Sequence, residues 1–182
     1  DPRYSTSWTT LPMWDNGKFG DVDAGDSTYT IVLPASVSSH RSLVRYRISA
    51  KNSKGAVITT PMADDPQPNF AFFCYDGIPS WQGSARPNHK PPVTYSKELL
   101  ESLPVYHLIT TREAHVDSQN IPNSNSGKYG GSEYKWKGTL VYDGIVYDHI
   151  RFRARGGVWR YAMGKNMWKF DFNRGHGFQA RN

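Results

Sequence analysis

The amino-acid sequence predicts a soluble, mainly β protein made of two modules. Short runs in which apolar and polar side chains alternate recur along the chain, as they do in half-buried strands. The 16 glycines and 12 prolines fall mainly between these runs, where turns are expected. No apolar run reaches the roughly 20 residues that a membrane-spanning helix needs. The composition therefore favours antiparallel sheets in a chain without a membrane span.

The N-terminal module, residues 1–77, has the pattern of an immunoglobulin-like or fibronectin-like β-sandwich. Apolar residues alternate with polar ones in Thr28–Leu33 and in Val44–Ala50, which turns Arg45 outward. Further short runs at 56–60 and 69–75 follow at spacings bounded by turn residues. Several short strands at such spacing are typical of a two-sheet sandwich.

A linker and a second module are expected after this sandwich. Residues 78–95 are rich in Gly, Pro, Ser and Asn and have no periodicity, which indicates a surface linker. The second module, residues 96–182, opens with a short helix over 96–103, with Ser96 as its N-cap. A strand over 103–110 follows it. We therefore expect a small α+β lobe in which antiparallel strands dominate.

The clearest local signal in the second module is Asp143-Gly144, between two apolar runs. This dipeptide predicts a hairpin with a type I′ turn. The strand after the turn continues to residue 155. Its alternation places Arg151, Arg153 and Arg155 on one face and apolar residues on the other.

A second basic strand is expected beside this arginine row. Residues 167–172 alternate again, and pairing would bring Lys165 and Lys169 toward the arginines. Residues 127–182 contain eleven Lys and Arg against four Asp and Glu, whereas the preceding residues contain eleven against twelve. Such a face suits phosphate or another polyanion. A solvated face, or ion pairs with carboxylates of a neighbouring element, explains the same pattern.

Two consecutive segments near the C-terminus have a distinctive order. Residues 147–157 read YDHIRFRARGG, and residues 158–172 read VWRYAMGKNMWKFDF. They resemble the amino-terminal part of the CotH kinase-like family, named for a spore-coat protein. That family typically has an Arg-x-Arg-Gly segment, a short loop and a Lys-rich strand ending in an aromatic residue, which Arg153–Gly156 and Lys165–Phe172 match. With LPVY at 103–106, which is similar to the first strand of that domain, the resemblance covers about residues 100–182.

The resemblance implies an atypical protein-kinase-like fold, here an incomplete amino-terminal lobe. It implies binding of ATP with a divalent metal such as Mg²⁺, and phosphorylation of Ser or Thr in surface or coat proteins. It further implies that Arg153, Arg155, Lys165 and Lys169 line the phosphate side of the nucleotide cleft. The catalytic base and metal-binding acids of the family lie further along the chain than Asn182. We therefore expect this chain by itself to bind a nucleotide or another polyanion, or to be a structural piece, without catalysis.

The N-terminal module is similar to the β-sandwich that precedes such domains in large secreted bacterial proteins. That sandwich often carries a Gly-Asp-x-x-x-Gly-Asp segment, which Gly20–Asp26 matches. The resemblance implies an extracellular or cell-surface location. In the same loop, Asp21, Asp23 and Asp26 offer the oxygen ligands that Ca²⁺ prefers. Asx turns before a strand also explain these residues, without a metal.

Carbohydrate binding is an alternative function, with a cell-surface glycan or protein as partner. Six Trp and eleven Tyr in a polar, loop-rich β protein suit stacking on sugar rings. The candidates near loops are Trp81, Trp136 and Trp159, and core packing also explains each of them. Nucleic-acid binding is disfavoured, because the aromatic residues of the last third alternate to the side away from the basic row.

Overall fold

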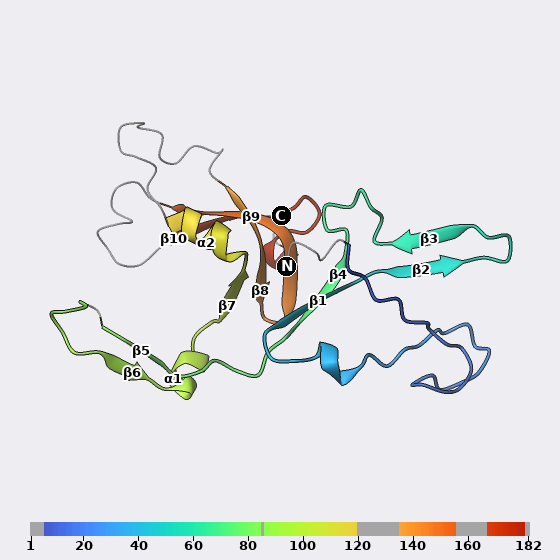
Figure 1. Cartoon of the computed structure of the whole chain (residues 1–182), viewed down its shortest axis with the longest axis horizontal. Helices are drawn as coiled ribbons and strands as arrows, with labels where there is room; N and C mark the ends of the chain where they lie inside the picture. The colour runs from blue at the N-terminus through green and yellow to red at the C-terminus, as the bar shows by residue number, and fades with distance from the viewer. Residues whose placement is uncertain (1–5, 85, 120–134, 156–166, 181–182) are drawn as a thin grey trace.

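The computed structural model describes residues 6–84, 86–119, 135–155 and 167–180. It confirms a mainly β chain with few helices and antiparallel sheets. Figure 1 shows a central sheet from which two hairpins project on opposite sides. The longest described helix has eight residues, and no helix in the described ranges is long and apolar enough to cross a membrane.

The central sheet has four antiparallel strands in the order β10-β9-β8-β7. These strands are β7 (Tyr106–Ile109), β8 (Trp136–Tyr142), β9 (Ile145–Arg155) and β10 (Met167–Asp171). The turn between β8 and β9 has φ values of 50° at Asp143 and 73° at Gly144. Positive φ at both central residues is the mark of a type I′ turn, so the predicted hairpin is confirmed.

One face of this sheet carries the core. Leu140, Tyr147 and Ile150 are buried together, and three phenylalanines pack against them: Phe170, Phe172 and Phe178. Phe178 comes from a 3₁₀ turn, η3 (Phe178–Ala180), that folds back near the sheet. Alternation along β9 thus predicted the apolar face correctly, since apolar burial is what fixes which way a strand faces.

The N-terminal module contains two separate two-stranded sheets. β1 (Ser42–Tyr46) pairs with β4 (Phe70–Cys74), and β2 (Ile48–Lys51) pairs with β3 (Val57–Thr60). A 3₁₀ turn, η1 (Ala35–Val37), precedes β1. The immunoglobulin-like sandwich is not confirmed by this arrangement. The expectation of a continuous strand over Val44–Ala50 was wrong, because its two halves pair with different partners.

The predicted strand over Thr28–Leu33 was also wrong. It is reduced to one antiparallel bridge, in which Thr30 and Trp14 exchange backbone hydrogen bonds of 2.8 and 2.9 Å. On the side that alternation predicts to be buried, Tyr29 and Leu33 are 61% and 40% exposed. The apolar side chains of this run alternate with polar ones, but they have no apolar layer to pack against.

The expected linker contains regular structure. β5 (Trp81–Gly83) pairs with β6 (Val93–Tyr95), followed by α1 (Lys97–Glu101) and, after β7, by α2 (Arg112–Gln119). The Ser96 hydroxyl accepts a hydrogen bond of 3.3 Å from the Leu99 amide, which confirms the predicted N-cap. The hairpin was missed because strands of three residues are too short to show a period.

The N-terminal module packs directly on the central sheet. The loop between β3 and β4 supplies a carboxylate, Asp65, which lies 3.3 Å from the ring of His176. The Asn173 amide donates hydrogen bonds of 3.2 Å to the carbonyl of Pro66 and 3.0 Å to that of Asp148. The contacts of Asp65 and Pro66 join segments more than 100 positions apart in the sequence.

Candidate functional site

A basic strip lies on the face of the central sheet opposite the core. It comprises Lys135, Lys137, Arg151, Arg153, Arg155 and Lys169. The strand register places Lys169 opposite Arg153 and Lys137 opposite Arg151. Directly opposite residues in an antiparallel pair point to the same face, so these cations are neighbours. The structure thus brings three of the four residues predicted to hold phosphate onto one strip, and Lys165 lies outside the described residues.

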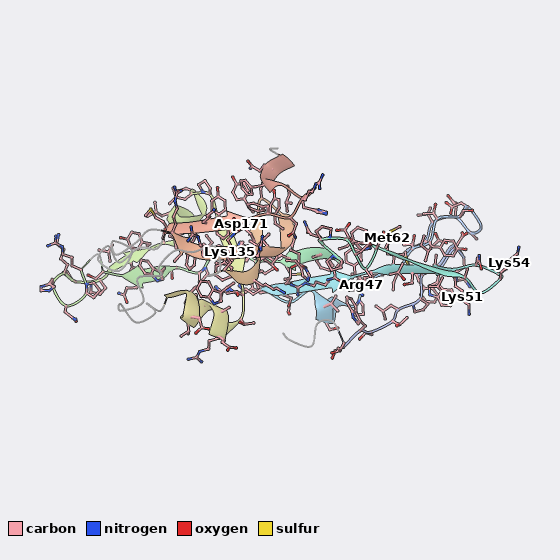
Figure 2. All side chains as sticks on the ribbon, turned by 90° about the horizontal axis from the view of Figure 1, so that it is seen from above. Arg47, Lys51, Lys54, Met62, Lys135 and Asp171 are labelled. Carbon is pink, nitrogen blue, oxygen red and sulfur yellow. The ribbon has the colours of Figure 1, made fainter. Side chains whose placement is uncertain are left out.

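One carboxylate, Asp171, sits inside the strip and is engaged there. It forms an ion pair with Lys135 and lies 3.9 Å from the Lys169 ammonium group. Figure 2 shows Lys135 and Asp171 together on the sheet. The hydrogen bond from Lys135 lowers the pKa of Asp171 despite partial burial, and the charges of Lys169 and Arg151 lower it further. This carboxylate is therefore ionised and offsets one of six positive charges.

Beside the strip, on the same face of the sheet, lies a buried ion pair that sequence reasoning missed. The carboxylate of Asp148 is 1% exposed and accepts hydrogen bonds from Arg45 of 2.6 Å and 2.9 Å. The Thr139 hydroxyl donates a third, of 2.5 Å. Burial would raise the pKa of Asp148, but hydrogen bonds from Arg45, His149 and Thr139 hold it well below its usual range. Arg45, predicted to face outward, is instead half-buried against β9.

A β-bulge aims Asp148 at Arg45. The register shifts between Gly138 and Leu140, so that Asp148 and His149 together oppose the single residue Thr139. His149 has φ of 54°, so one of the two bulged residues adopts the left-handed backbone conformation. The sequence does carry a signal for the bulge. Tyr147 and Ile150 both enter the core although they are three residues apart, not two.

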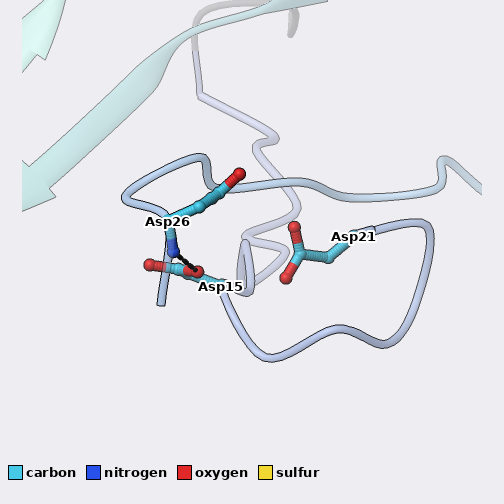
Figure 3. Close-up of side chains that lie close together, drawn as sticks. All are labelled: Asp15, Asp21 and Asp26. Atoms are coloured by element: carbon cyan, nitrogen blue, oxygen red, sulfur yellow. Dashed lines mark hydrogen bonds between the residues drawn. The ribbon is translucent and has the colours of Figure 1, made fainter. Parts of the chain in front are cut away.

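The carboxylates that converge in the acidic loop are not the same three that the sequence predicted. Carboxylate oxygens of Asp15, Asp21 and Asp26 lie within 4.8 Å of one another, while Asp23 is not in the group. Figure 3 shows the three side chains converging. Asp15 accepts hydrogen bonds from the backbone amides of three residues, Gly25 (2.6 Å), Asp26 (3.1 Å) and Ser27 (3.0 Å). These hydrogen bonds explain the conformation of the loop without a metal. Calcium binding by the three carboxylates stays a prediction.

The candidate sugar-binding tryptophans occupy unlike environments. Trp81 on β5 is 59% exposed, and its ring stacks on Tyr95 with centroids 5.6 Å apart. Trp136 on β8 is half-buried beside Phe152, with centroids 6.5 Å apart. Trp159 lies outside the described residues. Of the two that can be placed, Trp81 has the exposure that stacking on a sugar needs.

Comparison with known proteins identifies no relative. No family model, no curated protein and no solved structure matches this chain.

Proposed function

We propose that the basic strip binds the phosphate chain of a nucleotide, as part of the amino-terminal lobe of a kinase-like protein. The observation that carries this proposal is the pairing of like charges across the strands: Arg153 faces Lys169, and Arg151 faces Lys137. Like charges directly opposite one another destabilise a sheet. A bound polyanion would relieve this repulsion. Arginine forks match phosphate oxygens, and lysine adds a point charge.

The packing of the sheet supports the same proposal. The other face of β9 is anchored in the core by Ile150 and Phe152, each 1% exposed. The buried pair of Arg45 and Asp148 holds the start of β9 against the N-terminal module. A row of cations on a rigid strand is held ready for a ligand, so that less side-chain entropy is lost on binding.

The proposal concerns binding, and transfer of the phosphoryl group is not part of it. Phosphoryl transfer needs carboxylates that hold a metal and orient the nucleophile. Within the described residues, Asp171 is the carboxylate on this strip, and it is paired with Lys135. The CotH-like resemblance supports a parent protein that is a secreted or cell-surface phosphotransferase, in which further carboxylates complete the site.

Calorimetric titration with ATP, with and without Mg²⁺, tests the proposal. We expect saturable binding that weakens at least about tenfold in Arg153→Ala/Lys169→Ala, because charge-assisted hydrogen bonds to phosphate are lost. The matched control is Lys51→Ala/Lys54→Ala, which removes the same charge from the β2–β3 hairpin, far from the strip in Figure 2. Absence of binding at millimolar ATP, or equal weakening in both double variants, would refute the proposal.

Carbohydrate binding is the second candidate, and one observation favours it. The indole of Trp81 lies over Gly83, where an added Cβ would come within 2.1 Å of the ring. Gly83 and the stacked Tyr95 thus hold an exposed indole flat on the hairpin, which is the geometry for stacking on a sugar face. A glycan array probed with the wild type and Trp81→Ala tests this, with Trp8→Ala as the control. Glycan binding lost only in Trp81→Ala would support this function, and equal binding by all three would reject it.

A further inference from the structure

A second concave site lies where the N-terminal module meets β7 and α2. It is an open cleft of about 560 Å³, and no residue of the basic strip lines it. Phe73 of β4 and His107 of β7 are among its lining residues, and their rings lie 5.0 Å apart. Four basic side chains share the lining: Arg41, His107, Arg112 and His115. Ligand pockets of small molecules typically have volumes of about 300–1,000 Å³, so the cleft is of suitable size.

The charge in this cleft is uncompensated. Among the residues that the structure describes, no Asp or Glu lines it. Arg41 and Arg112 are exposed, and neither forms an ion pair in the part of the chain that the structure describes. Glu101, whose charge reaches nearby Tyr75, is itself engaged by Lys97 at 3.8 Å. The cleft is therefore positive at neutral pH.

Burial and this surplus of positive charge both keep the His107 side chain neutral. Burial lowers the pKa of His107, and the charge of Arg41 lowers it further. The His107 ring packs edge-on against Tyr75, with centroids 4.2 Å apart, and lies 5.0 Å from Phe73. A neutral imidazole surrounded by aromatic rings adds an apolar wall beside the guanidinium groups.

Arg41 is held in an unusual backbone conformation. Its φ is 64°, in the left-handed region that few residues other than glycine adopt. A hydrogen bond of 2.8 Å from the Arg41 amide to the Cys74 carbonyl fixes this conformation at the edge of the cleft. Strained residues of this kind concentrate at ligand sites, where surrounding structure maintains them.

We propose that this cleft binds a small aromatic anion, with the ring against Phe73 and His107 and the carboxylate or phosphate at Arg41 and Arg112. Aromatic rings recognise a flat apolar body, and guanidinium groups recognise planar or tetrahedral oxyanions. The site is independent of nucleotide binding on the basic strip, because the two share no side chain.

The test uses NMR titration of the isotope-labelled full chain with benzoate, phenyl phosphate, inorganic phosphate and benzyl alcohol. We expect benzoate and phenyl phosphate to shift the resonances of Arg41, His107 and Arg112 saturably. Benzyl alcohol and inorganic phosphate each lack one half of the recognised chemistry, so they should bind at least about tenfold more weakly. The stronger of benzoate and phenyl phosphate identifies the preferred oxyanion.

Two variants and a matched control localise the binding. Arg41→Gln and Arg112→Gln should each weaken benzoate or phenyl phosphate binding about tenfold. Arg86→Gln, an exposed arginine outside the cleft, should leave the affinity unchanged. In the wild type, a bound anion should raise the pKa of His107, which can be followed without any substitution. No saturable shift, an unchanged pKa of His107 on ligand saturation, or equal affinity in all variants would overturn the proposal.

Discussion

Asp148 is the residue on which the junction between the two halves of the chain depends. It is buried, accepts two hydrogen bonds from Arg45, and lies 103 positions away from that partner in the sequence. Removing one member of a buried ion pair leaves the other charge without compensation, which costs far more than the pair contributes as a whole. The side chain of Arg45 is 19% exposed, so some solvent still reaches it.

Asp148→Asn should lower the free energy of unfolding by about 3 kcal/mol, measured by urea denaturation. Asp143→Asn, the same change in the exposed β8–β9 turn, should alter it by less than about 0.5 kcal/mol. The folded-state pKa of Asp148 is depressed, so its stabilising contribution is complete above about pH 4 and is lost as the pH falls below that value. This role would be contradicted if Asp148→Asn had the same free energy of unfolding as the wild type and lost it below pH 4 to the same extent.

The acidic loop yields a second prediction at this scale. Asp15→Ala removes the acceptor of three backbone amides, so it should cost about 1 kcal/mol, whereas Asp23→Ala should cost little. Calcium, if bound by the group, stabilises the fold further by mass action. We then expect Ca²⁺ to raise the melting temperature of the wild type and of Asp23→Ala, but not of Asp21→Asn. No response to Ca²⁺ in any of them would leave the hydrogen bonds as the whole explanation of the loop.

At the scale of elements, the β8–β9 hairpin is the feature most fully specified by its own sequence. Asp143-Gly144 predicted its turn, and alternation over residues 150–155 predicted which face is apolar. Both are local signals, because a turn depends on two residues and a strand face on a period of two. The basic strip follows from the same alternation once β10 pairs with β9.

The turn provides a quantitative test of that local control. Gly144 has φ of 73°, and an added Cβ would meet no atom within 4 Å. Gly144→Ala should therefore destabilise the fold by about 1 kcal/mol through backbone strain alone. Asp143→Asn should be close to neutral, because Asn tolerates the left-handed conformation. Equal stability of Gly144→Ala and wild type in urea would show that the turn does not depend on this conformation.

Other elements could not be predicted, because their causes are not local. Val44–Ala50 reads as one strand, yet it divides at Arg47 because each half finds a different partner. Thr28–Leu33 alternates well but has no apolar layer to face. The Arg45–Asp148 pair and the cleft around Arg41 and Arg112 arise from segments brought together only by folding.

At the scale of the whole molecule, the chain exposes much more surface than a compact protein of its mass. Its accessible surface is 13864 Å², against about 8900 Å² expected from the usual scaling with mass. The β2–β3 and β5–β6 hairpins, which project from the central sheet in Figure 1, contribute to this excess. Stability must therefore come from the central sheet and from the contacts that cross to β1 and β4.

Those contacts predict that the two halves unfold together. Arg45 with Asp148, and Asp65 with His176, tie the N-terminal module to the central sheet. Scanning calorimetry should give one transition, with calorimetric and van't Hoff enthalpies that agree. Two resolved transitions would mean that the modules are energetically independent, and that the buried ion pair does not couple them.

The central claim, that the basic strip holds a phosphate chain, is tested most directly by mapping ATP binding on the isotope-labelled chain by NMR. The account predicts saturable shifts at Arg151, Arg153 and Lys169, which weaken as salt screens the charges. Shifts confined to the cleft at Arg41 and Arg112, or no saturable shift at any residue, would contradict it.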